Sequence, residues 1–190
     1  KVLLIKISSL GDIIFNIPLA NSLKKAGYSV TWLVGEKGFD VIKNNPCTDD
    51  FILVPFEKWK NGRFSFSEYM FVLKQIRERN FDIVIDAQGR WKIDTSKKIN
   101  VIEKYLQFGK YLNIDTNPSD MSLPPSEEGT KDSVNALLQS IDFEKPVVVI
   151  CPQTTWDTKH WDKENWRKLV DIIDDKFSLI FTGTNFDYVE

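Results

Sequence analysis

A single carboxylate, Asp12, follows the first apolar run of the chain, within the segment KISSLGDIIFNIP. That run, Val2–Ile7, is interrupted only by Lys6, and its composition predicts a buried parallel strand. In open α/β sheets, ligands bind in the crevice outside the carboxyl ends of the strands. Asp12 is therefore a candidate general base. The alternative is that Asp12 only N-caps the helix expected to begin at Ile13.

A second candidate segment, PQTTWDTKHWDKENW (residues 152–166), also lies between an expected strand and an expected helix. The hydroxyl groups of Thr154 and Thr155 and the charge of Lys159 stand ahead of the helix N-terminus, where anions bind readily. This combination suits a phosphate or a diphosphate. The alternative is a solvated loop in which the threonines cap the helix and Trp161 and Trp166 pack beneath it.

Several other cations follow predicted strands. The basic and aromatic segment 56–66 contains Lys58, Lys60 and Arg63, and Arg90 and Lys92 follow the sequence DAQG at residues 86–89. Such charges would suit an anionic acceptor. The alternative is that they belong to ordinary solvated loops. The tryptophans are expected to serve packing, although Trp59 and Trp91 stand in loops near the candidate residues.

Strands and helices alternate regularly, which predicts an α/β fold with a doubly wound parallel sheet and right-handed crossovers. Apolar runs, glycines and prolines define the boundaries of these elements. The expected strands are 2–7, 29–34, 51–54, 81–85, 147–150 and 178–181, and the expected helices are 13–26, 39–44, 67–79, 101–112, 131–141 and 163–174.

The bulk properties exclude several classes of protein. A net charge of −2 argues against general nucleic-acid binding. The two cysteines, Cys47 and Cys151, have no metal-ligand spacing and fit a reducing cytosol, so a cytoplasmic location is expected. The single histidine, His160, rules out a site with several histidine ligands, and no metal is expected. No apolar run of about 18 residues and no GxGxxG, P-loop, CxxC or HExxH motif is present.

The pattern changes after residue 92, because the next strand does not come until residue 147. We therefore expect a Rossmann-like N-terminal domain at 1–112, a linker region with a helix at 113–145, and the start of a second domain at 146–190. The chain begins with Lys and stops just after a strand and a turn, so the second domain is expected to be incomplete. Residues are also expected to be missing near 92–94.

Three segments, KISSLGDIIFNIP, FDIVIDAQG and TTWDTKHWDKENW, resemble glycosyltransferase family 9, and within it the lipopolysaccharide heptosyltransferases. The resemblance implies a GT-B architecture, with two Rossmann-like domains facing across a cleft. It implies an inverting transfer of heptose from ADP-heptose to the Kdo-lipid A inner core, without a cofactor. Because no anchor is visible, contact with the inner membrane would be peripheral, through the lipid acceptor.

The resemblance also implies roles for individual residues. Asp12 would be the general base, and the donor would contact Thr154, Thr155, Lys159 and Asp187. Independently of the resemblance, the residue types of Ser8, Ser9 and Gly11 predict that they shape the first turn and present backbone N–H groups rather than perform chemistry. The expected acceptor contacts are Ser9, Gly11, Lys58, Lys60, Arg63, Gln88 and Lys92.

One departure from the family leaves alternatives open. No D-T-G-x-x-H segment, which the family usually has in its C-terminal domain, follows Val147. The protein could therefore use another nucleotide sugar or be a nucleotide-binding module without catalysis. A nucleotide-sugar epimerase or dehydrogenase is a further alternative, and the missing GxGxxG argues against it.

Overall fold

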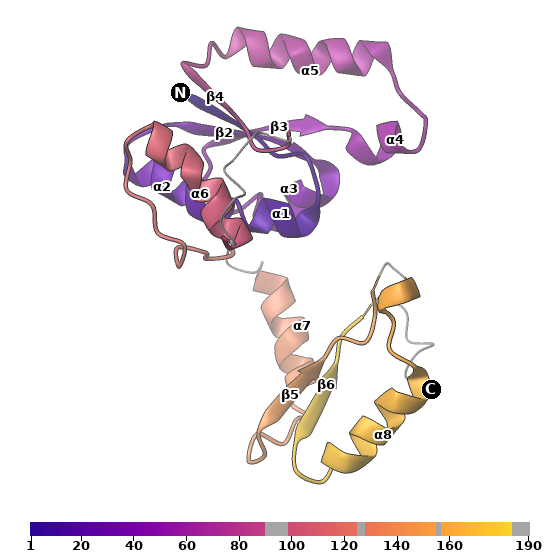
Figure 1. The fold of residues 1–190 in the computed structure, drawn as a ribbon. Coiled ribbons are helices and arrows are strands. Elements are labelled where there is room, and N and C mark those ends of the chain that lie inside the picture. Colours follow the sequence, from indigo (N-terminus) through magenta and orange to yellow (C-terminus); the bar gives the residue numbers. More distant parts are fainter. Residues whose placement is uncertain (90–98, 125–127, 155–156, 184–190) are drawn as a thin grey trace. The chain divides into compact units, whose positions relative to one another are not determined.

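The computed structural model describes residues 1–89, 99–124, 128–154 and 157–183. The chain divides into two compact units, Lys1–Pro125 and Ser126–Glu190 (Figure 1). The division falls within the region 113–145 that the sequence suggested as a linker. No helix in the described ranges is long and apolar enough to cross a membrane.

The first unit contains a four-stranded parallel sheet, with strand order β3-β2-β1-β4. The predicted α/β fold with a parallel sheet is therefore confirmed. Because β1 is an interior strand, the turn that follows it lies near the middle of the edge formed by the carboxyl ends of the strands. The elements, in chain order, are β1 (Val2–Ile5), α1 (Leu10–Ile14), α2 (Ile17–Lys25), β2 (Val30–Gly35), α3 (Glu36–Ile42), β3 (Asp50–Val54), α4 (Phe56–Lys60), α5 (Phe66–Glu78), β4 (Ile83–Asp86) and α6 (Val101–Tyr111).

Helices cover both faces of this sheet. Successive side chains of a strand point to opposite faces. Val2 and Leu4 accordingly join the core beneath α2 and α6, whereas Leu3 and Ile5 belong to a second cluster beneath α5. Figure 1 shows α5 on one side of the strands and α2 and α6 on the other. Burial on both faces explains why the strand sequences are nearly continuous apolar runs.

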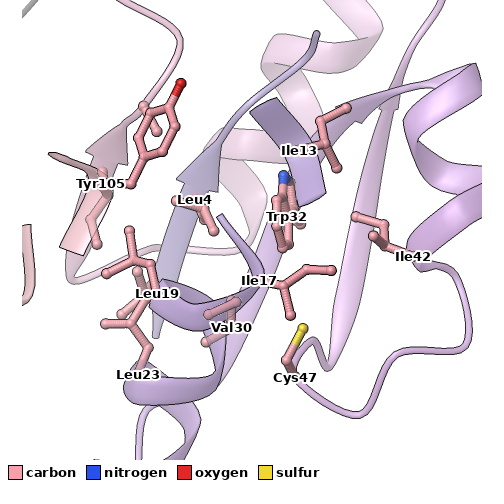
Figure 2. Packing of buried hydrophobic residues seen from close by; sticks show 14 of the residues in the cluster. Leu4, Ile13, Ile17, Leu19, Leu23, Val30, Trp32, Ile42, Cys47 and Tyr105 are labelled. Carbon is pink, nitrogen blue, oxygen red and sulfur yellow. The ribbon is translucent and has the colours of Figure 1, made fainter. Parts of the chain in front are cut away.

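The larger core surrounds Trp32 of β2, which is fully buried. Figure 2 shows the Trp32 side chain between Ile13 and Ile17, with Ile42 to its right in this view. The indole N–H donates to the backbone oxygen of Lys6 over 3.3 Å, so the polar atom of this large side chain is satisfied. Tyr105 packs at the edge of the same cluster, and its phenolic oxygen points away from the aliphatic side chains (Figure 2).

The expected single helix 13–26 is wrong, because the structure has two helices, α1 and α2, separated at Phe15 and Asn16. Pro18 explains the break. Proline has no backbone N–H and its ring clashes with a continuing helix, so it is tolerated only in the first turn. Pro18 accordingly stands in the first turn of α2, and the preceding helix ends at Ile14.

Other boundaries also differ from the expectation. Helix α3 begins at Glu36 rather than at residue 39, because Gly35, in an extended conformation, is its N-cap. The segment 56–66, expected as a loop, contains the short helix α4. Its apolar residues Phe56 and Trp59 are three apart, so one helical face packs them both against the sheet.

The second unit contains α7 (Glu128–Leu138), β5 (Val147–Ile150), the 3-10 turn η1 (Asp157–Lys159), α8 (Lys163–Ile173) and β6 (Ser178–Phe181). Strands β5 and β6 pair in parallel, so the expected strand-helix-strand unit is present. The side chain of Asp162 caps α8 by accepting from Glu164 N over 2.9 Å. The described N-cap of α8 is therefore an aspartate, not one of the threonines suggested by the alternative interpretation.

Candidate active site

Asp12 lies at the carboxyl end of β1, in the third position of α1. The N-cap of this helix is Ser9, so the interpretation of Asp12 as the N-cap is wrong. The hydroxyl and the backbone N–H of Ser9 donate to Asp12 Oδ2 over 3.1 and 3.5 Å. Both bonds end on the same carboxylate oxygen and anchor it within its own turn, and the bond from the Ser9 backbone N–H is the one that an N3 acidic residue makes in a capping box.

The other carboxylate oxygen is held from a distant helix. The Tyr105 hydroxyl of α6 donates to Asp12 Oδ1 over 3.1 Å. Burial, together with the neighbouring charge of Asp12, raises the pKa of Tyr105 to about 12. The phenol therefore remains protonated and continues to act as a donor at any physiological pH.

A buried lysine supplies the positive charge of the site. Lys6 Nζ lies 3.4 Å from Asp12 Oδ2 and 5.4 Å from the centroid of the Tyr105 ring. Only 5% of the Lys6 side chain is exposed. Buried charges are normally paired, so the lysine that interrupts the first apolar run is the partner of the candidate base.

These contacts determine the charge of Asp12. Burial raises the pKa of its carboxyl group, but Lys6 and the hydrogen bonds from Ser9 and Tyr105 outweigh burial, and the net pKa lies below its usual value. About a third of the side chain, 35%, remains exposed. The site thus presents an ionised, accessible carboxylate in a fixed orientation, which is what accepting a proton from a bound hydroxyl requires.

Gln88 braces the turn that leads to Asp12. Its side-chain Oε1 accepts from the backbone N–H groups of Ile7 and Ser8 over 2.9 and 3.1 Å. Asp86 Oδ1 in turn accepts from Gln88 N and Gly89 N over 2.9 and 3.0 Å. The DAQG segment therefore joins the carboxyl ends of β4 and β1. Acceptor contact by Gln88 stays a prediction.

Gly11 and Ser9, the other expected acceptor contacts of this turn, are exposed. Gly11 is in the first turn of α1, and an added Cβ there would meet no atom within 4 Å. The space in front of the turn is open at this position. Contact of Ser9 and Gly11 with an acceptor stays a prediction.

The three expected acceptor cations differ in their surroundings. Lys58 pairs with Glu68 over 2.5 Å, and Trp59 Nε1 donates to the other carboxylate oxygen over 3.1 Å. Lys58 thus serves to fasten α4 to α5. Lys60 and Arg63 are exposed at the end of α4 and just beyond it.

Helix α4 lies beside the turn that holds Asp12. A Cβ atom added to Gly35 would lie 2.9 Å from Ile7 O and 3.2 Å from Phe56 Cβ. Gly35 therefore permits a close approach of three segments at the carboxyl edge of the sheet: the end of β1, the end of β2 and the start of α4. Asp12 and the basic residues of α4 share that edge.

The candidate donor residues belong to the second unit. Thr154 is half-buried, and its backbone oxygen lies 2.7 Å from His160 Nε2, which closes the loop between β5 and α8. Lys159 is exposed on η1. Trp161 and Trp166 pack edge to face with ring centroids 4.8 Å apart. Thr155, Asp187 and Lys92, with Arg90 and Trp91, lie outside the described residues.

A cavity of about 640 Å³ lies elsewhere, at the C-terminal ends of α2 and α6. It contains none of the predicted site residues and is at the amino edge of the sheet, opposite Asp12. In the described parts of the chain, no group of three or more histidine, cysteine and acidic side chains is arranged to hold a metal ion.

Comparison with known proteins gives the family. The model of glycosyltransferase family 9 (heptosyltransferase) matches residues 90–190, just over half of the chain. The chain belongs to glycosyltransferase family 9. The resemblance seen in the three sequence segments is thereby confirmed.

Two curated relatives have the same name, lipopolysaccharide heptosyltransferase 1. The protein of Pseudomonas aeruginosa is 26% identical over 203 residues, covering 90% of this chain and 57% of the relative. That of Escherichia coli K12 is 23% identical over 210 residues, covering 92% of this chain and 65% of the relative. This chain therefore spans about three fifths of the length of these relatives.

Solved structures give the same fold. A family 9 glycosyltransferase from Veillonella parvula superposes with a TM-score of 0.82 at 19% identity, covering 98% of this chain and 63% of that one. E. coli heptosyltransferase WaaC with ADP-2-deoxy-2-fluoro heptose gives a TM-score of 0.64 at 21% identity, covering 98% and 70%. The predicted GT-B type of α/β fold is thereby confirmed, and this chain spans part of it.

Proposed function

We propose that this chain is part of an inverting heptosyltransferase that moves heptose from ADP-heptose to the Kdo-lipid A inner core in lipopolysaccharide biosynthesis. Its membership of family 9 and its similarity to proteins named lipopolysaccharide heptosyltransferase 1 support the proposal. The observation on which it rests is the ionised, partly exposed carboxylate of Asp12 at the carboxyl end of β1. The enzyme would act in the cytoplasm.

The proposed step uses Asp12 as the general base. An acceptor hydroxyl oxygen attacks the anomeric carbon of heptose, and the bond from that carbon to the β-phosphate oxygen breaks. The hydroxyl proton passes to Asp12, and ADP leaves with the electron pair of the broken bond. Lys6, Ser9 and Tyr105 keep the carboxylate charged and oriented before the transfer.

Donor and acceptor would be held by separate groups of residues. Thr154, Thr155 and Lys159 would contact the donor diphosphate, with Asp187 as a further donor contact. Hydroxyl groups and a lysine stabilise the negative charge that grows on the leaving diphosphate, so the step needs no metal or cofactor. The remaining group would contact the phosphorylated sugar acceptor; its members are Ser9, Gly11, Lys58, Lys60, Arg63, Gln88 and Lys92.

The variant Asp12→Asn tests the assigned role. The amide has nearly the same shape but cannot take the proton, so we expect transfer to fall by roughly 10²–10⁴-fold. Calorimetric titration should give an unchanged Kd for ADP, because the diphosphate contacts lie on other residues. Asp115→Asn, exposed at the opposite edge of the sheet, is the matched control. Turnover within a few-fold of the wild-type rate in Asp12→Asn would disprove the role.

The donor is tested separately by titrating ADP, UDP and GDP, each alone and as a nucleotide sugar. We expect ADP and ADP-heptose to bind most tightly. Preference for UDP or GDP would indicate a family member with another nucleotide sugar. Nucleotide binding with no transfer to any acceptor would favour a non-catalytic module, and NAD binding would revive the dehydrogenase alternative.

A further inference from the structure

Aromatic side chains of α4, of α5 and of the turn between them cluster at the surface. They are called here the aromatic patch: Trp59, which is half-buried, and Phe64, Phe66 and Tyr69, which are exposed. Their rings contact one another, with centroids 5.3 Å apart for Trp59 and Phe64, 6.0 Å for Phe64 and Tyr69, and 6.4 Å for Phe66 and Tyr69. Phe64 and Phe66 nevertheless remain 58% and 68% exposed. The rings therefore form one continuous apolar surface that faces solvent.

The patch continues along the outer side of α5. Phe66, Tyr69 and Met70 lie at positions i, i+3 and i+4 and so share a helical face, and Met70 is 41% exposed. The inner side of the same helix packs Val72 and Ile76 against the sheet. Tyr69 lies three and seven positions before Val72 and Ile76, so the exposed residues adjoin the packed face of α5. Phe66 and Met70 extend the apolar arc of the helix beyond the part that the sheet covers, and within the described ranges they remain exposed.

Cations border the patch. Arg63 immediately precedes Phe64 in the chain, and Lys60 stands four positions before it. Arg77 follows Met70 two turns later on α5, and all three cations are exposed. Residues 56–66 contain three cations and one acid, although the whole chain has a net charge of −2; one of the three cations, Lys58, is paired with Glu68. The exposed rings are therefore bordered by a locally basic surface that attracts anions. The rest of the protein, with its net negative charge, would be repelled by an anionic surface.

We propose that the aromatic patch and these cations form a docking surface for an anionic phospholipid bilayer. Aromatic side chains settle at the headgroup level of a membrane, and nearby Lys and Arg side chains are attracted to acidic lipids. A protein partner would match the apolar area equally well, but the combination of exposed rings with the exposed cations Lys60, Arg63 and Arg77 favours lipid. The inference goes beyond the proposed transfer, because bilayer binding requires neither donor nor acceptor.

Vesicle flotation tests the contribution of the rings. Vesicles of phosphatidylcholine alone are compared with vesicles of equal parts phosphatidylcholine and phosphatidylglycerol, both free of lipopolysaccharide. We expect the wild-type protein to float only with the anionic vesicles. Phe64→Ser with Phe66→Ser should weaken binding at least about tenfold, since two rings leave the bilayer interface. The control, Tyr111→Ser with Leu123→Ser, removes two apolar side chains that are also exposed and should bind as the wild type does.

The charges are tested in the same assay. Lys60→Gln with Arg63→Gln should weaken binding to anionic vesicles roughly fivefold per charge, and added salt should weaken wild-type binding. Lys104→Gln with Lys110→Gln on α6 removes the same charge elsewhere and should have little effect. Failure of the wild-type protein to bind anionic vesicles, or equal binding by the patch and control variants, would overturn the proposal.

A fluorescent label on the aromatic patch gives a second test that does not depend on whether the serine variants fold. Cys47 is buried, so in a Cys151→Ser background a cysteine placed by Phe66→Cys is the accessible one for an environment-sensitive fluorophore. Anionic vesicles should raise and blue-shift its emission. The same fluorophore at Tyr111→Cys should not respond. Identical responses at the two positions, or none at Phe66→Cys, would contradict insertion of the patch.

Discussion

The hydroxyl of Tyr105 donates to Asp12 Oδ1 over 3.1 Å, although the two residues are 93 positions apart in the chain. Tyr105 belongs to α6, and its ring packs against the same core as β1 and α2. The orientation of the candidate base therefore depends on the docking of α6 on the sheet as well as on its own turn. Substitutions in α6 are therefore expected to alter the orientation of the Asp12 carboxylate even where the substituted residue contacts no ligand.

Tyr105→Phe removes this donor and keeps the ring. Because one hydrogen bond that lowers the pKa of Asp12 is lost, that pKa should rise. We expect kcat to fall roughly tenfold, KM for the donor to stay unchanged, and the acidic limb of the kcat/KM profile to move to higher pH. Tyr111→Phe on the same helix is the control. A loss of thermal stability without any movement of the acidic limb would show that Tyr105 is purely structural.

Lys6→Met replaces the buried cation with an apolar side chain of similar length. Burial of Asp12 is then opposed only by the hydrogen bonds, so the pKa of Asp12 should rise. In the wild type this pKa is lowered by folding. Its contribution to the free energy of unfolding is therefore present above the unfolded-state pKa and is lost as pH falls through the folded-state pKa.

We accordingly expect Lys6→Met to reduce the free energy of unfolding by about 1–2 kcal/mol at about pH 7, since the pair is partly exposed. The difference from the wild type should shrink at an acidic pH below the folded-state pKa of Asp12, because Asp12 is then protonated and Lys6 loses its partner. Urea unfolding at both pH values measures this, with Lys110→Met as the control. An equal deficit at both pH values would exclude electrostatic pairing as its cause.

Most of the fold could be predicted from the sequence, because buried parallel strands are short apolar runs separated by helical patterns. The six expected strands are all present, with ends that differ by a few residues. The errors lie where a local rule opposes periodicity. Pro18 divides the first helical stretch, and α4 is a single turn whose two packed residues, Phe56 and Trp59, give too short a pattern to be recognised.

The candidate site could be predicted only in part. A carboxylate after the first strand is a local feature, and Asp12 was found in this way. Tyr105 could not be found, because no spacing in the sequence shows that α6 packs beside the first turn. Lys6 could have been found, since alternation along the strand after Val2 and Leu4 places it on the core face, where a lysine requires a partner.

Gln88→Ala should loosen the turn that leads to Asp12. Two backbone N–H groups, of Ile7 and Ser8, lose their acceptor, which should cost about 1–3 kcal/mol of stability and reduce turnover. Gln88→Glu keeps an acceptor oxygen and should retain most of the stability. Gln139→Ala, exposed on the second unit, controls for loss of a glutamine. If thermal unfolding gives the same midpoint for Gln88→Ala and Gln139→Ala, the bracing role is wrong.

Lys159→Ala tests the donor side of the proposal. The lysine is exposed on η1, just before α8, and its ammonium group would pair with the diphosphate of the donor. An ion pair between a lysine and a diphosphate is stronger than a surface ion pair between two side chains. Because Lys159→Ala removes this ion pair, we expect the Kd for ADP to rise about tenfold or more. Lys168→Ala, an exposed lysine of α8, should leave the Kd unchanged. Calorimetry with adenosine, which has no phosphate, distinguishes loss of the ion pair from distortion of the loop. Adenosine should bind both variants equally. A higher Kd for adenosine in Lys159→Ala would mean that the substitution has distorted the loop.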